Sequence, residues 1–133
     1  MTVRVLIFDH EPDVEMLFQQ QFRRELREGL YTLDFALSAL SALAILDEAI
    51  GEQIILLVSD INMPGMNGLD LLPIVKTRRP SLPVFMISAY GDAETVTTAR
   101  AHGADEFFTK PVDFPKLKRD IVAVMTDATG GNG

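Results

Sequence analysis

The feature that most constrains the fold is the regular alternation of short apolar runs with amphipathic helical patterns. Five runs have the length of β-strands: Val3 to Phe8, Leu33 to Leu37, Ile54 to Ser59, Val84 to Ser88 and Glu106 to Thr109. Between and after them, apolar residues recur with the three-and-four spacing of helices. Because parallel strands need helical crossover connections, this alternation predicts an α/β fold: a doubly wound parallel sheet of five strands with five helices on its two faces.

One helical pattern extends from Val14 to Leu26 and includes Leu17, Phe18 and Phe22, so these side chains are predicted to face the core. The 133 residues suit a single domain, which we place at residues 1–126. The remaining segment, 127–133, contains three of the nine glycines and is predicted to be a disordered tail.

Charge and composition restrict the classes of function. The net charge of −7 opposes direct binding to nucleic acid or to an anionic membrane, because a phosphate-rich surface needs a cationic partner face. The absence of cysteine excludes thiolate metal sites and a cysteine nucleophile. The amino terminus reaches Asp9 before any apolar stretch is long enough for a signal peptide, so we expect a cytoplasmic protein.

Polar side chains follow four of the five predicted strands. They are Asp9 after the first strand, Asp60 after the third, Ser88 at the end of the fourth and Lys110 after the fifth. The carboxyl ends of parallel strands meet at one edge of a sheet, where ligands bind in open α/β folds. Two acids, a hydroxyl and an ammonium group at one edge can hold a divalent cation and handle a phosphoryl group.

These residues and their neighbours resemble the receiver domains of response regulators, the phosphoacceptor half of two-component signalling, including the chemotaxis regulators. The resemblance is carried by Asp9 with Glu11, by the string from Ser59 to Gly68, by Ser88-Ala89 and by Phe107 to Pro111. It covers residues 3–125 and implies a flavodoxin-like sheet with strand order 2-1-3-4-5 and a cis peptide bond between Lys110 and Pro111.

The resemblance also implies how the site works. Asp60 is the phosphoacceptor, taking a phosphoryl group from a histidine kinase, a phosphotransfer protein or a small phosphodonor. Asp9, Asp60 and the backbone carbonyl of Asn62 hold Mg²⁺, and Lys110 neutralises the transferred group. Ser88 and the backbone amide of Ala89 bind the attached phosphoryl. Only self-directed phosphotransfer and autodephosphorylation are expected, so the chain is not predicted to be an enzyme.

Phosphorylation is implied to change a distant surface through Ser88 and an aromatic side chain on the fifth strand, here Phe107. An ordinary core phenylalanine is the competing interpretation of Phe107. The responding face spans Asp92 to Met125, where an output domain, a partner protein or a second copy would dock.

The sequence departs from the family at His10. Receivers usually carry two adjacent acids after the first strand, and the second acid ligates the magnesium ion. Imidazole is a poor ligand for this hard cation, and Glu11 offers partial compensation. Three interpretations follow: weakened metal binding, a preference for another metal such as Mn²⁺, or a degenerate receiver that acts as a phosphorylation-independent interaction module.

A different class of function from the switch and the interaction module, namely a small-molecule enzyme or flavin binder on the same architecture, is disfavoured. Such a protein needs a glycine- or hydroxyl-rich loop after the first strand, whereas this chain has His10-Glu11-Pro12-Asp13. The sequence identifies neither a cognate kinase nor an output domain.

Overall fold

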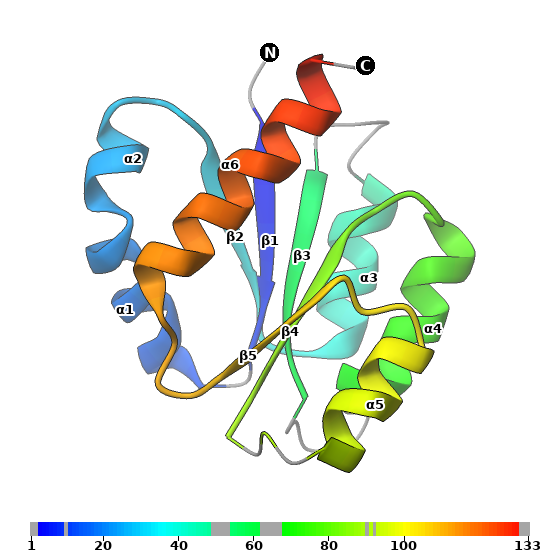
Figure 1. The fold of residues 1–133 in the computed structure, drawn as a ribbon. Coiled ribbons are helices and arrows are strands. Elements are labelled where there is room, and N and C mark those ends of the chain that lie inside the picture. Colours follow the sequence, from blue (N-terminus) through cyan, green and yellow to red (C-terminus); the bar gives the residue numbers. More distant parts are fainter. Residues whose placement is uncertain are drawn as a thin grey trace.

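The computed structural model describes residues 3–9, 11–48, 54–61, 68–89, 91 and 93–130 of the chain. The strands and helices follow one another in the predicted order (Figure 1). The strands are β1 (Arg4–Phe8), β2 (Thr32–Ala36), β3 (Ile54–Asp60), β4 (Val84–Ser88) and β5 (Glu106–Thr109). The helices are α1 (Pro12–Gln21), α2 (Arg23–Arg27), α3 (Ala39–Glu48), α4 (Gly68–Arg78), α5 (Ala93–Ala101) and α6 (Phe114–Gly130).

The five strands form one sheet in the order β2-β1-β3-β4-β5, and every neighbouring pair is parallel. Both the fold class and the strand order are therefore confirmed. All seven residues of β3 and all five of β4 are buried, which explains why their sequences are apolar almost without interruption. β2 lies at an edge and is mostly half-buried, which fits its more polar sequence.

Alternate side chains of the central strands point into two separate core layers. Leu6 and Phe8 of β1 pack with side chains from α3, α4 and α5, whereas Val5 and Ile7 pack with side chains from α1 and α6. In Figure 1, α6 crosses in front of the sheet, and α3, α4 and α5 lie on its other side. Helices on both faces leave the ends of the strands as the place where polar groups can gather.

The helical pattern from Val14 to Leu26 is divided into two helices. Phe22 leaves helical geometry, with φ −102° and ψ 13°, and separates α1 from the short α2. The described residues therefore contain five helices of nine or more residues, as predicted, and an additional one of five residues. Phe18 and Phe22 are buried, but Leu17 is 42% exposed, so its predicted place in the core is wrong.

The carboxyl-terminal helix is longer than the sequence suggested. α6 ends at Gly130, so its last four residues lie in the segment that was predicted to be a disordered tail. Residues 127–129 contain no glycine or proline, and no helix-stopping residue precedes Gly130. Residues 131–133 lie outside the described part of the chain.

Among the described residues, no helix is both long enough and apolar enough to cross a bilayer.

Candidate functional site

The four polar residues predicted to converge do meet at one edge of the sheet. Asp60 and Ser88 are the last residues of β3 and β4, and Asp9 and Lys110 follow β1 and β5 directly. The backbone continues the sheet pairing at this edge, because the Lys110 N–H donates to the Ser88 carbonyl at 2.9 Å. The strand order places these four strand ends side by side.

Lys110 lies among three carboxylates. Its Nζ donates a hydrogen bond to Oδ2 of Asp60 at 3.0 Å, and it lies 3.7 Å from Oδ2 of Asp9 and 4.0 Å from Oε1 of Glu11. Burial disfavours the charged amine, but the hydrogen bond and charge of Asp60, with the charges of Asp9 and Glu11, outweigh it and raise the pKa of Lys110. Lys110 is therefore a fixed positive charge at neutral pH.

The two aspartates are deeply buried for charged residues: Asp60 is 2% exposed and Asp9 is 7% exposed. Burial has the largest effect on the pKa of Asp9 and raises it. The backbone N–H of Glu11, which donates to Oδ1 of Asp9 at 3.0 Å, opposes this rise, while the charge of Asp60 adds to it. The net result is a raised pKa of Asp9, so its ionised form is unfavourable here.

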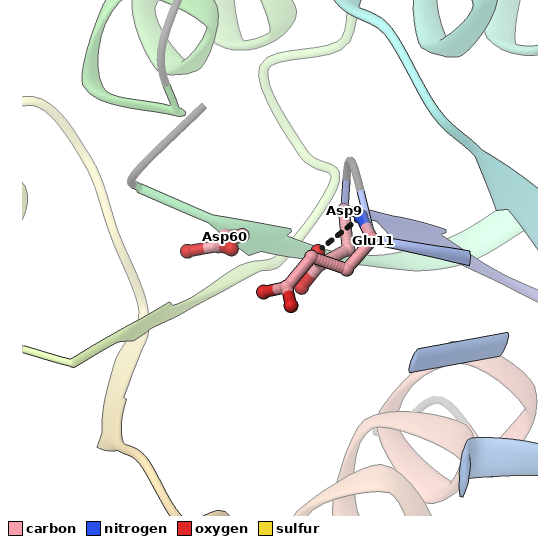
Figure 2. Close-up of side chains that lie close together, drawn as sticks. All are labelled: Asp9, Glu11 and Asp60. Atoms are coloured by element: carbon pink, nitrogen blue, oxygen red, sulfur yellow. Dashed lines mark hydrogen bonds between the residues drawn. The ribbon is translucent and has the colours of Figure 1, made fainter. Parts of the chain in front are cut away.

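The beginning of α1 orients Glu11 toward the site that contains Asp9, Asp60 and Lys110. Pro12 occupies the first turn of that helix, and a residue before proline is restricted to extended conformations; Glu11 has φ −94° and ψ 116°. The Glu11 carbonyl accepts the N–H of Val14 at 3.0 Å, but its side chain makes no capping hydrogen bond. In Figure 2 the Glu11 carboxylate points to the side on which Asp60 lies.

The three carboxylates form a set that could hold a metal ion. One oxygen from each of Asp9, Glu11 and Asp60 lies within 4.8 Å of the other two (Figure 2). Carboxylate oxygens are the ligands that Mg²⁺, Mn²⁺ and Ca²⁺ prefer in proteins. When all three are ionised, three negative charges face the single positive charge of Lys110, so a further cation would neutralise the remaining negative charge.

Gly68 brings the first turn of α4 against the backbone of Asp60. Its N–H donates to the Ile61 carbonyl at 3.0 Å. A Cβ atom at this position would lie 2.2 Å from the Asp60 carbonyl oxygen and 2.9 Å from Cα of Ile61. Both contacts are with backbone atoms, so no side chain fits at residue 68 without moving the end of β3.

The segment after β4 lies against the end of β5, the strand that Lys110 follows. Ser88 is 1% exposed and lies opposite Thr109 in the sheet register, and Ala89 is exposed. A Cβ atom on Gly91 would lie 2.4 Å from Cγ2 of Thr109. Ser88, at the end of β4, therefore lies between the ends of β3 and β5 in the sheet.

The two aromatic residues of β5 face opposite layers. Phe107 is half-buried and packs against the core beneath α3, α4 and α5, whereas Phe108 is buried on the side of α1 and α6. Phe107 lies opposite Met86 of β4 in the register. It has the position expected for the switch residue, and that role stays a prediction.

Two predicted site residues, His10 and Asn62, lie outside the described residues, as does Asp92 at the start of the proposed output face. The peptide bond between Lys110 and Pro111 is cis, as the resemblance implied. Two contributors to the site had no predicted role, namely Pro12 and Gly68. The sequence did contain signals for both: a proline directly after Glu11, and a glycine at the first residue of α4.

Comparison with known proteins agrees with this geometry. The family model "Response regulator receiver domain" matches residues 5–122. This chain belongs to the response regulator receiver domain family. The response regulator protein PilR of Pseudomonas aeruginosa is 37% identical over 120 residues, a match that covers 90% of this receiver domain and 25% of PilR. The chain therefore spans about a quarter of the length of this curated relative.

Solved receiver structures have the same fold. A CheY-like response regulator receiver domain protein from Methanospirillum hungatei superimposes with a TM-score of 0.83 at 25% identity, covering 96% of this chain and 97% of that one. The response regulator TrrA of Thermotoga maritima, solved in complex with Mg²⁺ and BeF, gives a TM-score of 0.75 at 26% identity, covering 92% of this receiver domain and 99% of TrrA.

Proposed function

We propose that this receiver domain is a phosphorylation-controlled switch in which Asp60 accepts the phosphoryl group. The observation that carries the proposal is the position of the Lys110 ammonium, 3.0 Å from Oδ2 of Asp60 and beside two further carboxylates. A carboxylate that is 2% exposed is costly unless it is paired, and a structural role would need only one partner. An excess of acids around one lysine is typical of a site that receives a cation and a phosphoryl group.

In the proposed reaction, an oxygen of Asp60 attacks the phosphorus atom of a phosphohistidine on a kinase or phosphotransfer protein. The new O–P bond forms as the P–N bond breaks, and the imidazole nitrogen retains the bonding electrons and takes up a proton. Lys110 lowers the repulsion between the Asp60 carboxylate and the incoming phosphoryl group. A small phosphodonor such as acetyl phosphate would react in the same way, with acetate as the leaving group.

Asp9 and Asp60, with the backbone carbonyl of Asn62, would hold Mg²⁺ or Mn²⁺. When bound, this cation adds positive charge at the phosphoryl oxygens and so lowers the barrier to transfer. The carboxylate donors described above fit such a hard cation, and the TrrA structure contains Mg²⁺ with BeF. Asp9 is already oriented for this role, since one of its oxygens accepts the Glu11 N–H and the other faces Lys110.

The attached phosphoryl group would be bound by residues at the end of β4. The hydroxyl of Ser88 and the backbone amide of Ala89 would donate to its oxygens, and the segment up to Gly91 would shift with them. Since Gly91 touches Thr109, this shift would reach β5 and change the packing of Phe107. The face formed by residues 93–125 would then bind an output domain, a partner protein or a second copy. The only chemistry we propose is phosphoryl transfer to Asp60 and hydrolysis of the same bond.

The test is to incubate the chain with acetyl phosphate and Mg²⁺, then with Mn²⁺, and to weigh the intact protein by mass spectrometry. We expect an adduct of one phosphoryl group that is absent from Asp60→Asn. Asp13→Asn is the matched control, because Asp13 is an exposed aspartate in the first turn of α1 and lies outside the cluster. If neither metal nor any kinase yields an adduct, the proposal is wrong and a phosphorylation-independent interaction module is favoured.

A further inference from the structure

Of the three carboxylates in the cluster of Asp9, Glu11 and Asp60, that of Glu11 contributes least to holding the local structure. It is the N-cap residue of α1, yet its side chain makes no capping hydrogen bond. Its distance from Lys110, 4.0 Å, is the longest of the three carboxylate separations, and its side chain is 55% exposed. We infer that Glu11 supplies the third carboxylate of the cation site, at the rim where the ion and its water molecules enter. This inference rests on the proposed function.

The local backbone explains why this side chain and not another one faces the site. Pro12 restricts Glu11, the residue before it, to an extended conformation. Pro12 itself fits the first turn of α1, where its missing N–H costs nothing, so the helix begins immediately after Glu11. The N–H of Glu11 is fixed at the same time, because it donates to Oδ1 of Asp9. The backbone of Glu11 thus orients one acid of the cluster, and its side chain adds a second one.

The chemistry of the ligands distinguishes Glu11 from its neighbour His10. Mg²⁺ and Mn²⁺ favour oxygen ligands, whereas a neutral imidazole favours Zn²⁺, Ni²⁺ and Cu²⁺. A site formed by Asp9, Glu11 and Asp60 has only carboxylate ligands and three negative charges. It binds a hard divalent cation without requiring an acid at position 10.

The experiment measures metal binding directly and does not depend on phosphorylation. Mn²⁺ is titrated into the complete chain, and free Mn²⁺ is quantified by electron paramagnetic resonance. Glu11→Gln is compared with Glu15→Gln, which removes the same charge from an exposed position in the first turn of the same helix. We expect Glu11→Gln to weaken Mn²⁺ binding by about tenfold or more and Glu15→Gln by less than about twofold, because even indirect partners of a metal contribute about tenfold. Urea midpoints of both metal-free variants show that they are folded.

The inference is overturned if Glu11→Gln binds Mn²⁺ like Glu15→Gln, whatever the effect of His10→Ala. It is also overturned if the unmodified chain fails to bind Mn²⁺. The proposed function is judged by a separate readout, since a phosphoryl adduct on Asp60 can form even when Glu11→Gln leaves the metal affinity unchanged. In that case Glu11 is not a ligand, and the switch remains supported.

Discussion

Cα of Gly68 faces the backbone of Asp60 so closely that a Cβ atom on it would lie 2.2 Å from the Asp60 carbonyl oxygen. Gly68→Ala must therefore push the end of β3 out of place, and we expect a loss of about 3 kcal/mol in the free energy of unfolding, measured with urea. Phosphorylation of Asp60 by acetyl phosphate should fall as well, because its carboxylate moves relative to Lys110.

Gly29→Ala is the control for this substitution. Gly29 has φ +72° and nothing within 4 Å of a Cβ atom, so alanine there meets only the backbone cost of a left-handed conformation, about 1 kcal/mol. Equal losses in the two variants would show that the contact with Asp60 is relieved cheaply.

Replacement of Asp9 should make the metal-free protein more stable. The pKa of Asp9 is raised above its ordinary value of 3.8, so the folded state binds this proton more tightly than the unfolded chain does. The stabilisation from this proton is fully present below the unfolded value and is lost as the pH rises through the folded value. At pH 7 the ionised Asp9 is therefore unfavourable, and Asp9→Asn removes its charge while an amide oxygen can still accept the Glu11 N–H.

We expect the urea midpoint of Asp9→Asn to exceed that of the unmodified protein at pH 7 in the presence of a chelator. The advantage should shrink as the pH falls through the raised folded pKa of Asp9, and it should vanish below about 4, where Asp9 is protonated in both states. A lower midpoint at pH 7 would mean that Lys110 and the Glu11 N–H stabilise the Asp9 charge more than burial opposes it.

Lys110→Met tests the ion pair with Asp60. The substitution keeps much of the side-chain volume but leaves a carboxylate that is 2% exposed without its ammonium partner. We expect a loss of about 1–3 kcal/mol in the free energy of unfolding at pH 7, less than for a fully buried pair because the Lys110 side chain is 30% exposed.

The double variant Lys110→Met/Asp60→Asn should regain most of this stability, since no charge is then left unpaired at residue 60. The coupling energy from the double-mutant cycle measures the pair. A coupling near zero would show that other partners of Asp60 suffice.

Tyr31→Phe should change the stability of the protein in alkaline solution. Tyr31 is 1% exposed, and within the described part of the chain no group bonds its hydroxyl. Burial, followed by the negative charge of Glu25, raises the pKa of Tyr31 well above 10.0. The folded state therefore keeps the hydroxyl proton after the unfolded chain has lost it, and stability declines by about 1.4 kcal/mol per pH unit above pH 10.

Phenylalanine has no proton to lose, so Tyr31→Phe should show a shallower decline between pH 10 and pH 11 in urea unfolding. At pH 7 its stability should equal or exceed that of the unmodified protein, because the substitution removes a buried polar atom that lacks a partner. Parallel pH profiles for the two proteins would contradict the assignment to Tyr31.

The sheet and the meeting of Asp9, Asp60, Ser88 and Lys110 were predictable because both follow from periodicity. Apolar runs separated by helical patterns require parallel strands, and parallel strands bring their carboxyl ends to one edge. The break at Phe22 and the exposure of Leu17 were not predictable in this way. The apolar spacing continues through residue 22, and it indicates which side chains share a helix face but not where the helix bends away from the core.

The finer geometry of the site depends on backbone details that side-chain patterns do not report. Gly68 was part of the recognised motif, but only the three-dimensional path of the chain shows that it touches Asp60. Glu11 was expected to compensate partly for His10, and the position of its carboxylate near those of Asp9 and Asp60 follows from the extended backbone that Pro12 imposes. Proline and glycine positions were thus the informative signals for the part of the site that periodicity missed.

Lys110 follows the final strand of the sheet, 50 residues after the aspartate that it neutralises. A polypeptide emerging from the ribosome therefore carries its acids long before their counter-charge, and any version cut short ahead of β5 lacks the lysine that lies among the three carboxylates. The proposed phosphoacceptor site is therefore complete only once β5 and the lysine that follows it have been made. On the proposed function, copies that end before β5 would accept phosphate poorly, because they lack the ammonium group that lowers repulsion at Asp60.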